Sequence, residues 1–266
     1  MEKRDAHIHT PYCPHGAKDK FEEYIEQALI KGFSSITFTE HAPLPHSFAD
    51  PTPLKDSAMK EEDVEPYIIE INRLKEQYKN EITIKTGFEV DYIAGFEEET
   101  QDFLNRYGPQ LDDSILSVHF IKCHDQWLCI DYSPDTFSEA IRLTGGADHV
   151  YQLYFNQVLK SIRADLGPFK PRRIGHITLA AKFQKKYPPS HSFSSSITEI
   201  LKEIKEKRYE LDMNTAGLRK PLCREIYPRP DILTAAKQMG IPLVFGSDAH
   251  HAKELGADYS LIQEYL

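Results

Sequence analysis

Two hydrophobic periods alternate along the chain. Short runs rich in β-branched and aromatic residues predict buried strands, and stretches in which apolar residues recur every three or four positions predict helices. Seven strands are expected, at residues 4–9, 35–39, 82–89, 114–119, 173–177, 209–214 and 241–247. Helices are expected at 21–32, 64–78, 96–107, 135–166, 196–207 and 230–240, with a last helix running to Leu266.

The strict alternation of strands and helices predicts an α/β fold with a parallel sheet covered by helices. An open doubly wound sheet and a closed barrel both satisfy this pattern. A length of 266 residues suits one α/β barrel, and no linker interrupts the chain, so a single domain over 1–266 is expected. A small hairpin is expected near 127–130, and the helical stretch 135–166 should break at the two glycines 145–146.

Net charge and cysteine content exclude several classes of protein. The 32 basic and 41 acidic residues give a net charge of −9, which disfavours nucleic acid and anionic membranes as partners. The polar start of the chain argues against a signal peptide, and no apolar run is long enough to span a bilayer. Cys13, Cys123, Cys129 and Cys223 form no C-x-x-C pair, so free thiols in a cytoplasmic protein are expected.

Histidine and acidic side chains gather at the C-terminal ends of six of the seven expected strands. In a barrel these ends share one face, where active sites are built. Each histidine taken alone is more typical of a surface or capping position, and only the shared placement indicates a metal site. The nine candidate ligands are His7, His9, His15, His41, Glu89, His119, His176, Asp248 and His250. A tetrahedral ion needs four ligands, so nine donors predict two or three ions, and imidazole with carboxylate is compatible with Zn, Fe or Mn.

Several motifs resemble the polymerase-and-histidinol-phosphatase (PHP) superfamily. They are DAHIHT at 5–10, CPHG at 13–16, TFTEHAPLP at 37–45, GFEVD at 87–91, SVHF at 117–120, RIGHITL at 173–179 and FGSDAH at 245–250. The segments TEHAPLP and NTAGLRK, the latter at 214–220, resemble the monofunctional histidinol-phosphate phosphatase branch. The resemblance implies a distorted barrel of seven β-α units and a centre of three divalent transition-metal ions.

The resemblance also implies a role for each ligand. It assigns His7, His9, Glu89 and Asp248 to one ion, Glu89, His119 and His176 to a second, and His15, His41 and His250 to a third. Glu89, Asp248 and His250 are the expected catalytic residues. The implied reaction is hydrolysis of L-histidinol phosphate to L-histidinol and inorganic phosphate, with metals lowering the pKa of the attacking water.

Arginine side chains are the expected partners of the substrate phosphate, because their fork can pair two oxygens. Arg173 precedes His176 by three residues, and Arg219 follows the sixth strand, which offers no metal ligand. Lys182 is expected to be a solvated helix residue. Three alternatives remain open: a PHP-type phosphoesterase acting on nucleotides or other small phosphomonoesters, a metal-dependent amidohydrolase, and a metal-binding module without activity. The oligomeric state and the residues that bind the substrate imidazole are left undetermined.

Overall fold

The computed structural model describes residues 3–266 and contains one seven-stranded parallel sheet. Its strands are β1 (Arg4–Ile8), β2 (Ser35–His41), β3 (Thr83–Asp91), β4 (Ile115–Ser117), β7 (Arg173–Ile174), β8 (Glu210–Asn214) and β9 (Leu243–Gly246), which are neighbours in this order. An antiparallel hairpin of β5 (Phe120–Cys123) and β6 (Gln126–Cys129) follows β4. The first two residues of the polar N-terminal stretch, which argued against a signal peptide, lie outside the described residues.

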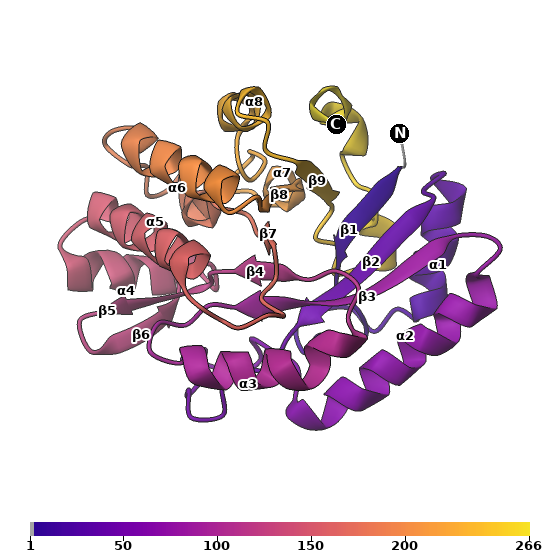
Figure 1. The fold of residues 1–266 in the computed structure, drawn as a ribbon. Helices are drawn as coiled ribbons and strands as arrows, with labels where there is room; N and C mark the ends of the chain where they lie inside the picture. The colour runs from indigo at the N-terminus through magenta and orange to yellow at the C-terminus, as the bar shows by residue number, and fades with distance from the viewer. Residues whose placement is uncertain (1–2) are drawn as a thin grey trace.

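Helices surround the sheet on its outer side (Figure 1). They are α1 (Phe21–Ile30), α2 (Val64–Tyr78), α3 (Glu97–Tyr107), α4 (Pro134–Thr144), α5 (Ala147–Arg163), α6 (Ser194–Glu206), α7 (Ala216–Arg219) and α8 (Pro230–Gln238). Short 3-10 turns η1 (Glu61–Asp63), η2 (Gly108–Gln110), η3 (Leu179–Phe183), η4 (Ala252–Glu254), η5 (Tyr259–Leu261) and η6 (Gln263–Tyr265) complete the chain. Within residues 3–266, no helix has the length and apolar character needed to cross a bilayer.

The chain that leaves β9 closes the sheet against β1. The backbone N–H of His9 donates to the Ala249 carbonyl at 2.9 Å, and the N–H of Asp248 donates to the His7 carbonyl at 2.8 Å. This pairing lies beyond the last residue of β9, and β7 has only two residues, so the barrel is irregular. The expected distorted α/β barrel is confirmed, with its first and last strands side by side (Figure 1).

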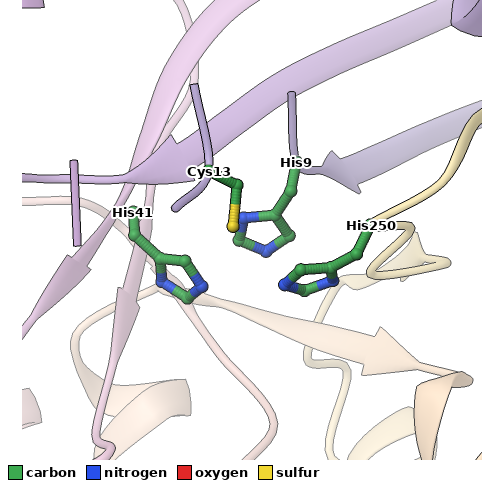
Figure 2. A group of neighbouring side chains, drawn as sticks. All are labelled: His9, Cys13, His41 and His250. Carbon is green, nitrogen blue, oxygen red and sulfur yellow. The ribbon is translucent and has the colours of Figure 1, made fainter. Parts of the chain in front are cut away.

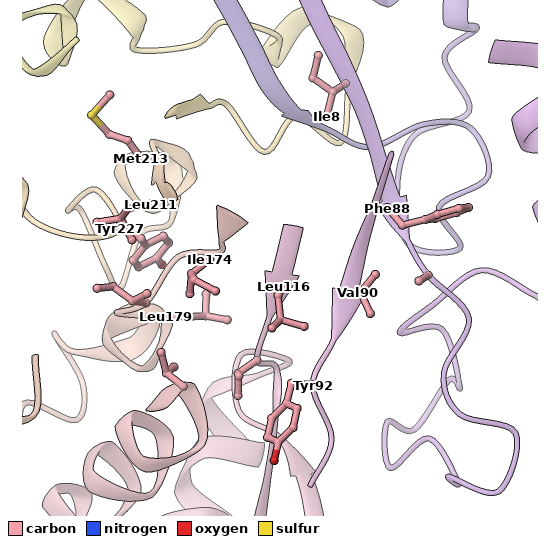
Figure 3. Packing of buried hydrophobic residues seen from close by; sticks show 14 of the residues in the cluster. Ile8, Phe88, Val90, Tyr92, Leu116, Ile174, Leu179, Leu211, Met213 and Tyr227 are labelled. Atoms are coloured by element: carbon pink, nitrogen blue, oxygen red, sulfur yellow. The ribbon is translucent and has the colours of Figure 1, made fainter. Parts of the chain in front are cut away.

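Apolar side chains from the strands and the surrounding helices form one large core. Figure 3 shows part of it, where Leu116, Ile174, Leu211 and neighbouring side chains pack together. Fully burying a side chain of this size contributes about 1.5–3 kcal/mol. The core therefore fixes the strands, and the strands fix the positions of the polar side chains at their ends.

A cluster of three charged side chains lies at the opposite, N-terminal end of the barrel. Asp113 accepts hydrogen bonds from Arg4 at 2.6 Å and from Arg173 at 3.1 Å. Arg173 is the first residue of β7, and only 1% of its side chain is exposed. The prediction that Arg173 binds substrate phosphate is therefore wrong, because its guanidinium is paired and enclosed at the end of the barrel away from the histidines.

The C-terminal segment differs from its expected helix. Residues 252–265 form the three separate turns η4, η5 and η6. Gly256 and Asp258 adopt left-handed φ values of 66° and 61°, which a right-handed helix cannot contain. The fifth strand is also shorter than expected and stops before Gly175, where a Cβ atom would lie 2.1 Å from the Ser117 hydroxyl. The hairpin and the break between α4 and α5 are confirmed.

Candidate metal centre

All nine predicted ligands lie at the C-terminal end of the barrel. A cavity of about 390 Å³ opens there, and its lining includes His15, His41, Glu89, His119, His176, Asp248 and His250. His7 and His9 lie beneath these residues with no exposed surface. The clustering predicted from the strand ends is therefore confirmed.

Glu89, near the end of β3, occupies the middle of the cluster and is 1% exposed. Two groups of imidazoles surround its carboxylate. One oxygen, Oε2, lies 3.3 Å from His7 Nε2, 3.4 Å from His9 Nε2 and 3.2 Å from His41 Nδ1. The other, Oε1, lies 2.8 Å from His176 Nε2 and 3.7 Å from His119 Nε2. A carboxylate with donors on both sides has the geometry required to bridge two cations.

Four groups of side chains in this cluster are spaced closely enough to share an ion. They are His7, His9 and Glu89; Glu89, His119 and His176; His9, Cys13, His41 and His250; and His41, Asp91 and His119. The first two agree with the ligand sets that the resemblance implied, and Asp248 Oδ1 lies 3.1 Å from His9 Nε2. In the third, the rings of His9, His41 and His250 turn toward one another with Cys13 beside His9 (Figure 2).

His15 lies next to that third group without closing it. Its ring centre is 5.1 Å from that of His41 and 5.2 Å from that of His250. Its Nδ1 donates to the Asp56 carbonyl at 2.7 Å, which ties the ring to the loop between β2 and η1. Asp56 and Ser57 also line the cavity, so this loop forms part of its wall.

A second layer of carboxylates orients the buried rings. Asp212 lies 3.0 Å from His7 Nδ1, Glu40 lies 3.2 Å from His9 Nδ1, and Asp91 lies 2.9 Å from His119 Nδ1. Each carboxylate accepts a hydrogen bond from Nδ1–H, so Nε2 of the same ring is turned inward, where a metal ion would bind it. Glu40 and Asp91 belong to the TEH and GFEVD motifs, and Asp212 shows that β8 supports the site although it offers no ligand of its own.

Several buried nitrogens make no hydrogen bond in the described part of the chain. They are Nε2 of His7, Nε2 of His9, Nδ1 of His41 and Nδ1 of His176. An unsatisfied buried polar group costs about 1–3 kcal/mol, so these nitrogens, three of which lie beside the Glu89 carboxylate, would be unfavourable without a ligand. The residues present therefore fit a group of divalent cations.

Backbone geometry brings Asp248 into this cluster. Asp248 has a left-handed φ of 53°, and its side chain accepts a hydrogen bond from Asn214 Nδ2 at 3.1 Å. Just before it, Gly246 allows β9 to approach β1 closely, since a Cβ there would lie 2.6 Å from the His7 Cβ and 2.7 Å from Asp212 Oδ1. The strained turn and the missing side chain together place a carboxylate from the last strand beside histidines from the first.

The basic side chains that line the cavity are not the arginines that were predicted to bind phosphate. Arg219, at the end of α7, donates to the Ser247 carbonyl at 2.7 Å and lies 3.5 Å from Asp258, and it does not line the cavity. Lys182 and Lys220 do line it. Lys182 was expected to be solvated, but it is 20% exposed and its Nζ lies 2.8 Å from Asp131.

Charges within the cluster shift the pKa of its members. Burial alone would lower the pKa of His7 and of His119, but neighbouring carboxylates, Glu89 among them, outweigh burial and raise both to about 10. Burial alone would raise the pKa of Glu89 and of Asp248, but the histidines hold both well below their usual range. In the metal-free protein, protons therefore occupy rings whose nitrogens a metal requires.

Metal uptake is expected to release protons and to weaken as pH falls. With pKa values of about 10, His7 and His119 are protonated in the metal-free protein throughout the neutral range, so binding must displace roughly two protons or more. Each displaced proton lowers the apparent affinity about tenfold per pH unit on acidification. Titration calorimetry of the metal-free protein with zinc, in buffers of different ionisation enthalpy, measures the number. Uptake without proton release would contradict these charge states.

Comparisons with known proteins agree with this geometry. The family model described as PHP domain matches residues 5–216, and the model described as PHP-associated matches 232–265. A histidinol-phosphatase of Bacillus subtilis is 53% identical over 266 residues, covering 99% of both chains. A probable histidinol-phosphatase of Deinococcus radiodurans is 34% identical and covers 95% of this chain and 88% of its own.

Solved structures show the same barrel. A crystal structure of a Listeria monocytogenes protein assigned as a histidinol phosphatase superposes with a TM-score of 0.93 at 41% identity, covering 97% of this chain and 99% of the other. Histidinol phosphate phosphatase of Lactococcus lactis, solved with zinc, L-histidinol and phosphate, gives a TM-score of 0.73 at 22% identity. It covers 99% of this chain and 94% of its own, and at that identity it supports the fold alone.

Proposed function

The chain belongs to the PHP domain family, and from that premise we propose that it is a histidinol-phosphatase, which hydrolyses L-histidinol phosphate to L-histidinol and inorganic phosphate. The observation that carries the proposal is the pair of imidazole groups on the two sides of the Glu89 carboxylate. The proposed ligands come from both segments of the chain that match a family model, 5–216 and 232–265, and they lie in one cluster. This supports a single catalytic domain over residues 1–266.

The ligand sets support three divalent transition-metal ions. His7, His9, Glu89 and Asp248 would hold the first, Glu89, His119 and His176 the second, and His15, His41 and His250 the third. Bound there, such ions would activate water and neutralise phosphoryl oxygens. Zinc, iron and manganese all suit these imidazole and carboxylate donors.

The residues of this chain define what the cavity admits. Glu89, Asp248 and His250 line it and are the residues that we place at the reacting phosphate. Lys182 and Lys220 add positive charge to the wall of a protein whose net charge is −9. A volume of about 390 Å³ suits a small phosphomonoester, and the acidic surface disfavours long nucleic acid. We also propose a cytoplasmic location, which four free, buried cysteines support.

A panel of small phosphomonoesters tests the proposal. L-histidinol phosphate is expected to exceed nucleoside monophosphates and glycerol phosphate by at least about a hundredfold in kcat/KM, since a site built to pair polar groups rejects substrates that lack them. Metal content should be measured on the same preparation, so that an inactive result is not caused by missing ions. Equal or faster turnover of a nucleotide would replace this assignment by the phosphoesterase alternative.

A further inference from the structure

One wall of the cavity contains an ion pair that makes no direct hydrogen bond to the proposed metal ligands in the described chain. Asp131, just after β6, lies 2.8 Å from the Nζ of Lys182 in η3. The two side chains are 18% and 20% exposed, so both are held mainly inside the protein while still reaching the cavity. A buried ion pair gives little net stability, because the cost of removing two charges from water offsets their attraction. Its place in the cavity wall therefore indicates a role in binding.

Asp131 differs from the other carboxylates of the cavity. Glu89, Asp91 and Asp248 already face histidine rings, whereas Asp56 belongs to the loop between β2 and η1 and Glu254 to η4. Asp131 is fixed by two hydrogen bonds, from Lys182 to Oδ2 at 2.8 Å and from the Cys129 thiol to Oδ1 at 3.2 Å. Each carboxylate oxygen offers about two lone pairs, so both can accept a further hydrogen bond. The result is a rigid, negatively charged acceptor inside the site.

Lys182 is likewise only partly satisfied. Its ammonium has three N–H groups, and within residues 3–266 it makes one hydrogen bond, to Asp131. It lies close enough to the metal cluster for the charge of Asp248 to act on it. The remaining N–H groups are available to an anion bound at the cluster.

We propose that Asp131 and Lys182 together recognise an aminoalkyl phosphate: Asp131 accepts a hydrogen bond from the primary ammonium of the substrate, and Lys182 donates to a phosphoryl oxygen. This inference rests on the proposed function. In L-histidinol phosphate the ammonium group is on the carbon next to the esterified CH₂ group, so its two charges are close together. An acid and a base in direct contact in the cavity wall present the complementary charges at a similar spacing.

The test compares two substrates that differ only in the ammonium group. These are L-histidinol phosphate and its desamino analogue, 3-(imidazol-4-yl)propyl phosphate. Asp131→Asn keeps the shape of the side chain and removes its charge. It is expected to lower kcat/KM for L-histidinol phosphate roughly 10- to 100-fold, which is the range for a hydrogen bond between charged groups. The decrease in kcat/KM for the analogue should be much smaller. Lys182→Gln is expected to slow both substrates, because both contain the phosphate.

Glu254→Gln is the matched control, since Glu254 is a second carboxylate of the cavity wall that contacts no histidine of the cluster. It should leave the preference for the amino substrate intact. Binding of the two product alcohols to the enzyme gives a readout without turnover. Asp131→Asn should weaken the binding of L-histidinol roughly 10-fold or more and should change the binding of the desamino alcohol little. Metal content and circular dichroism should match the parent.

The outcomes separate this inference from the proposed function. If Asp131→Asn slows both substrates equally, or if Glu254→Gln is the variant that removes the preference, Asp131 does not bind the ammonium. If the parent enzyme hydrolyses the analogue as well as L-histidinol phosphate, the ammonium subsite is absent although the phosphatase assignment stands. If the parent hydrolyses neither, the proposed function fails and this inference fails with it.

Discussion

Glu89→Gln is expected to lower kcat/KM for L-histidinol phosphate by at least about a thousandfold and to remove at least one bound ion. Loss of a carboxylate that only orients a metal ligand typically costs 10- to 100-fold, and Glu89 lies between two groups of ligands, so the effect should be larger. The substitution replaces an anionic oxygen by an amide NH₂, which cannot bind a cation, in the middle of five imidazoles. Kinetics and elemental analysis on the same sample measure both effects.

Glu62→Gln is the matched control, because Glu62 is an exposed carboxylate in η1 that pairs with Lys60 and not with a residue of the cluster. It should retain the activity and metal content of the parent. Circular dichroism should show that the Glu89 variant keeps its helices, since the hydrophobic core does not depend on this carboxylate. A Glu89→Gln protein with a full set of ions and near-parent activity would exclude the bridging role.

Removal of all metal is expected to abolish hydrolysis and to lower the melting temperature. Ions that bind only the folded state stabilise it by about 4 kcal/mol for each site held at a thousandfold excess over its Kd. The metal-free cluster also retains buried nitrogens without hydrogen bonds in the described chain. Activity should return when zinc, manganese or iron is added after the chelator is removed.

Elemental analysis of the active protein gives the number of ions that this prediction requires. The nine donors and the proposed ligand sets predict three ions per chain. Full activity with one ion or none would contradict the multinuclear site. A melting temperature unchanged by chelation would show that the cluster is satisfied without metal.

Much of this architecture can be predicted from the sequence, because strand ends are a local property. The positions of His7, His9, His41 and Glu89 follow from hydrophobic runs that end in polar residues, and a closed parallel sheet brings such ends together. The supporting carboxylates could have been found in part. Asp212 and Asn214 alternate along β8 on one face, which indicates a second polar layer toward the site.

The positions of the two arginines could not be predicted, because closeness in sequence to a site residue does not show at which end of the barrel a side chain lies. Arg173 is three residues from His176, yet it begins its strand at one end of the barrel whereas His176 follows that strand at the other. Its partner Asp113 is sixty residues away in the sequence. Arg219 lies in the predicted loop, but its guanidinium turns to the Ser247 carbonyl, while Lys182 gains its place in the cavity from the distant Asp131.

The seam between β1 and the chain after β9 also dictates when the centre can form in a living cell. Asp248 and His250 are made roughly 240 residues after His7 and His9, a delay of about 10–50 s at usual rates of translation. Nascent chains therefore hold an incomplete set of the proposed ligands until Asp248 and His250 have been made. Shorter products of synthesis that stop before these two residues lack part of the proposed centre.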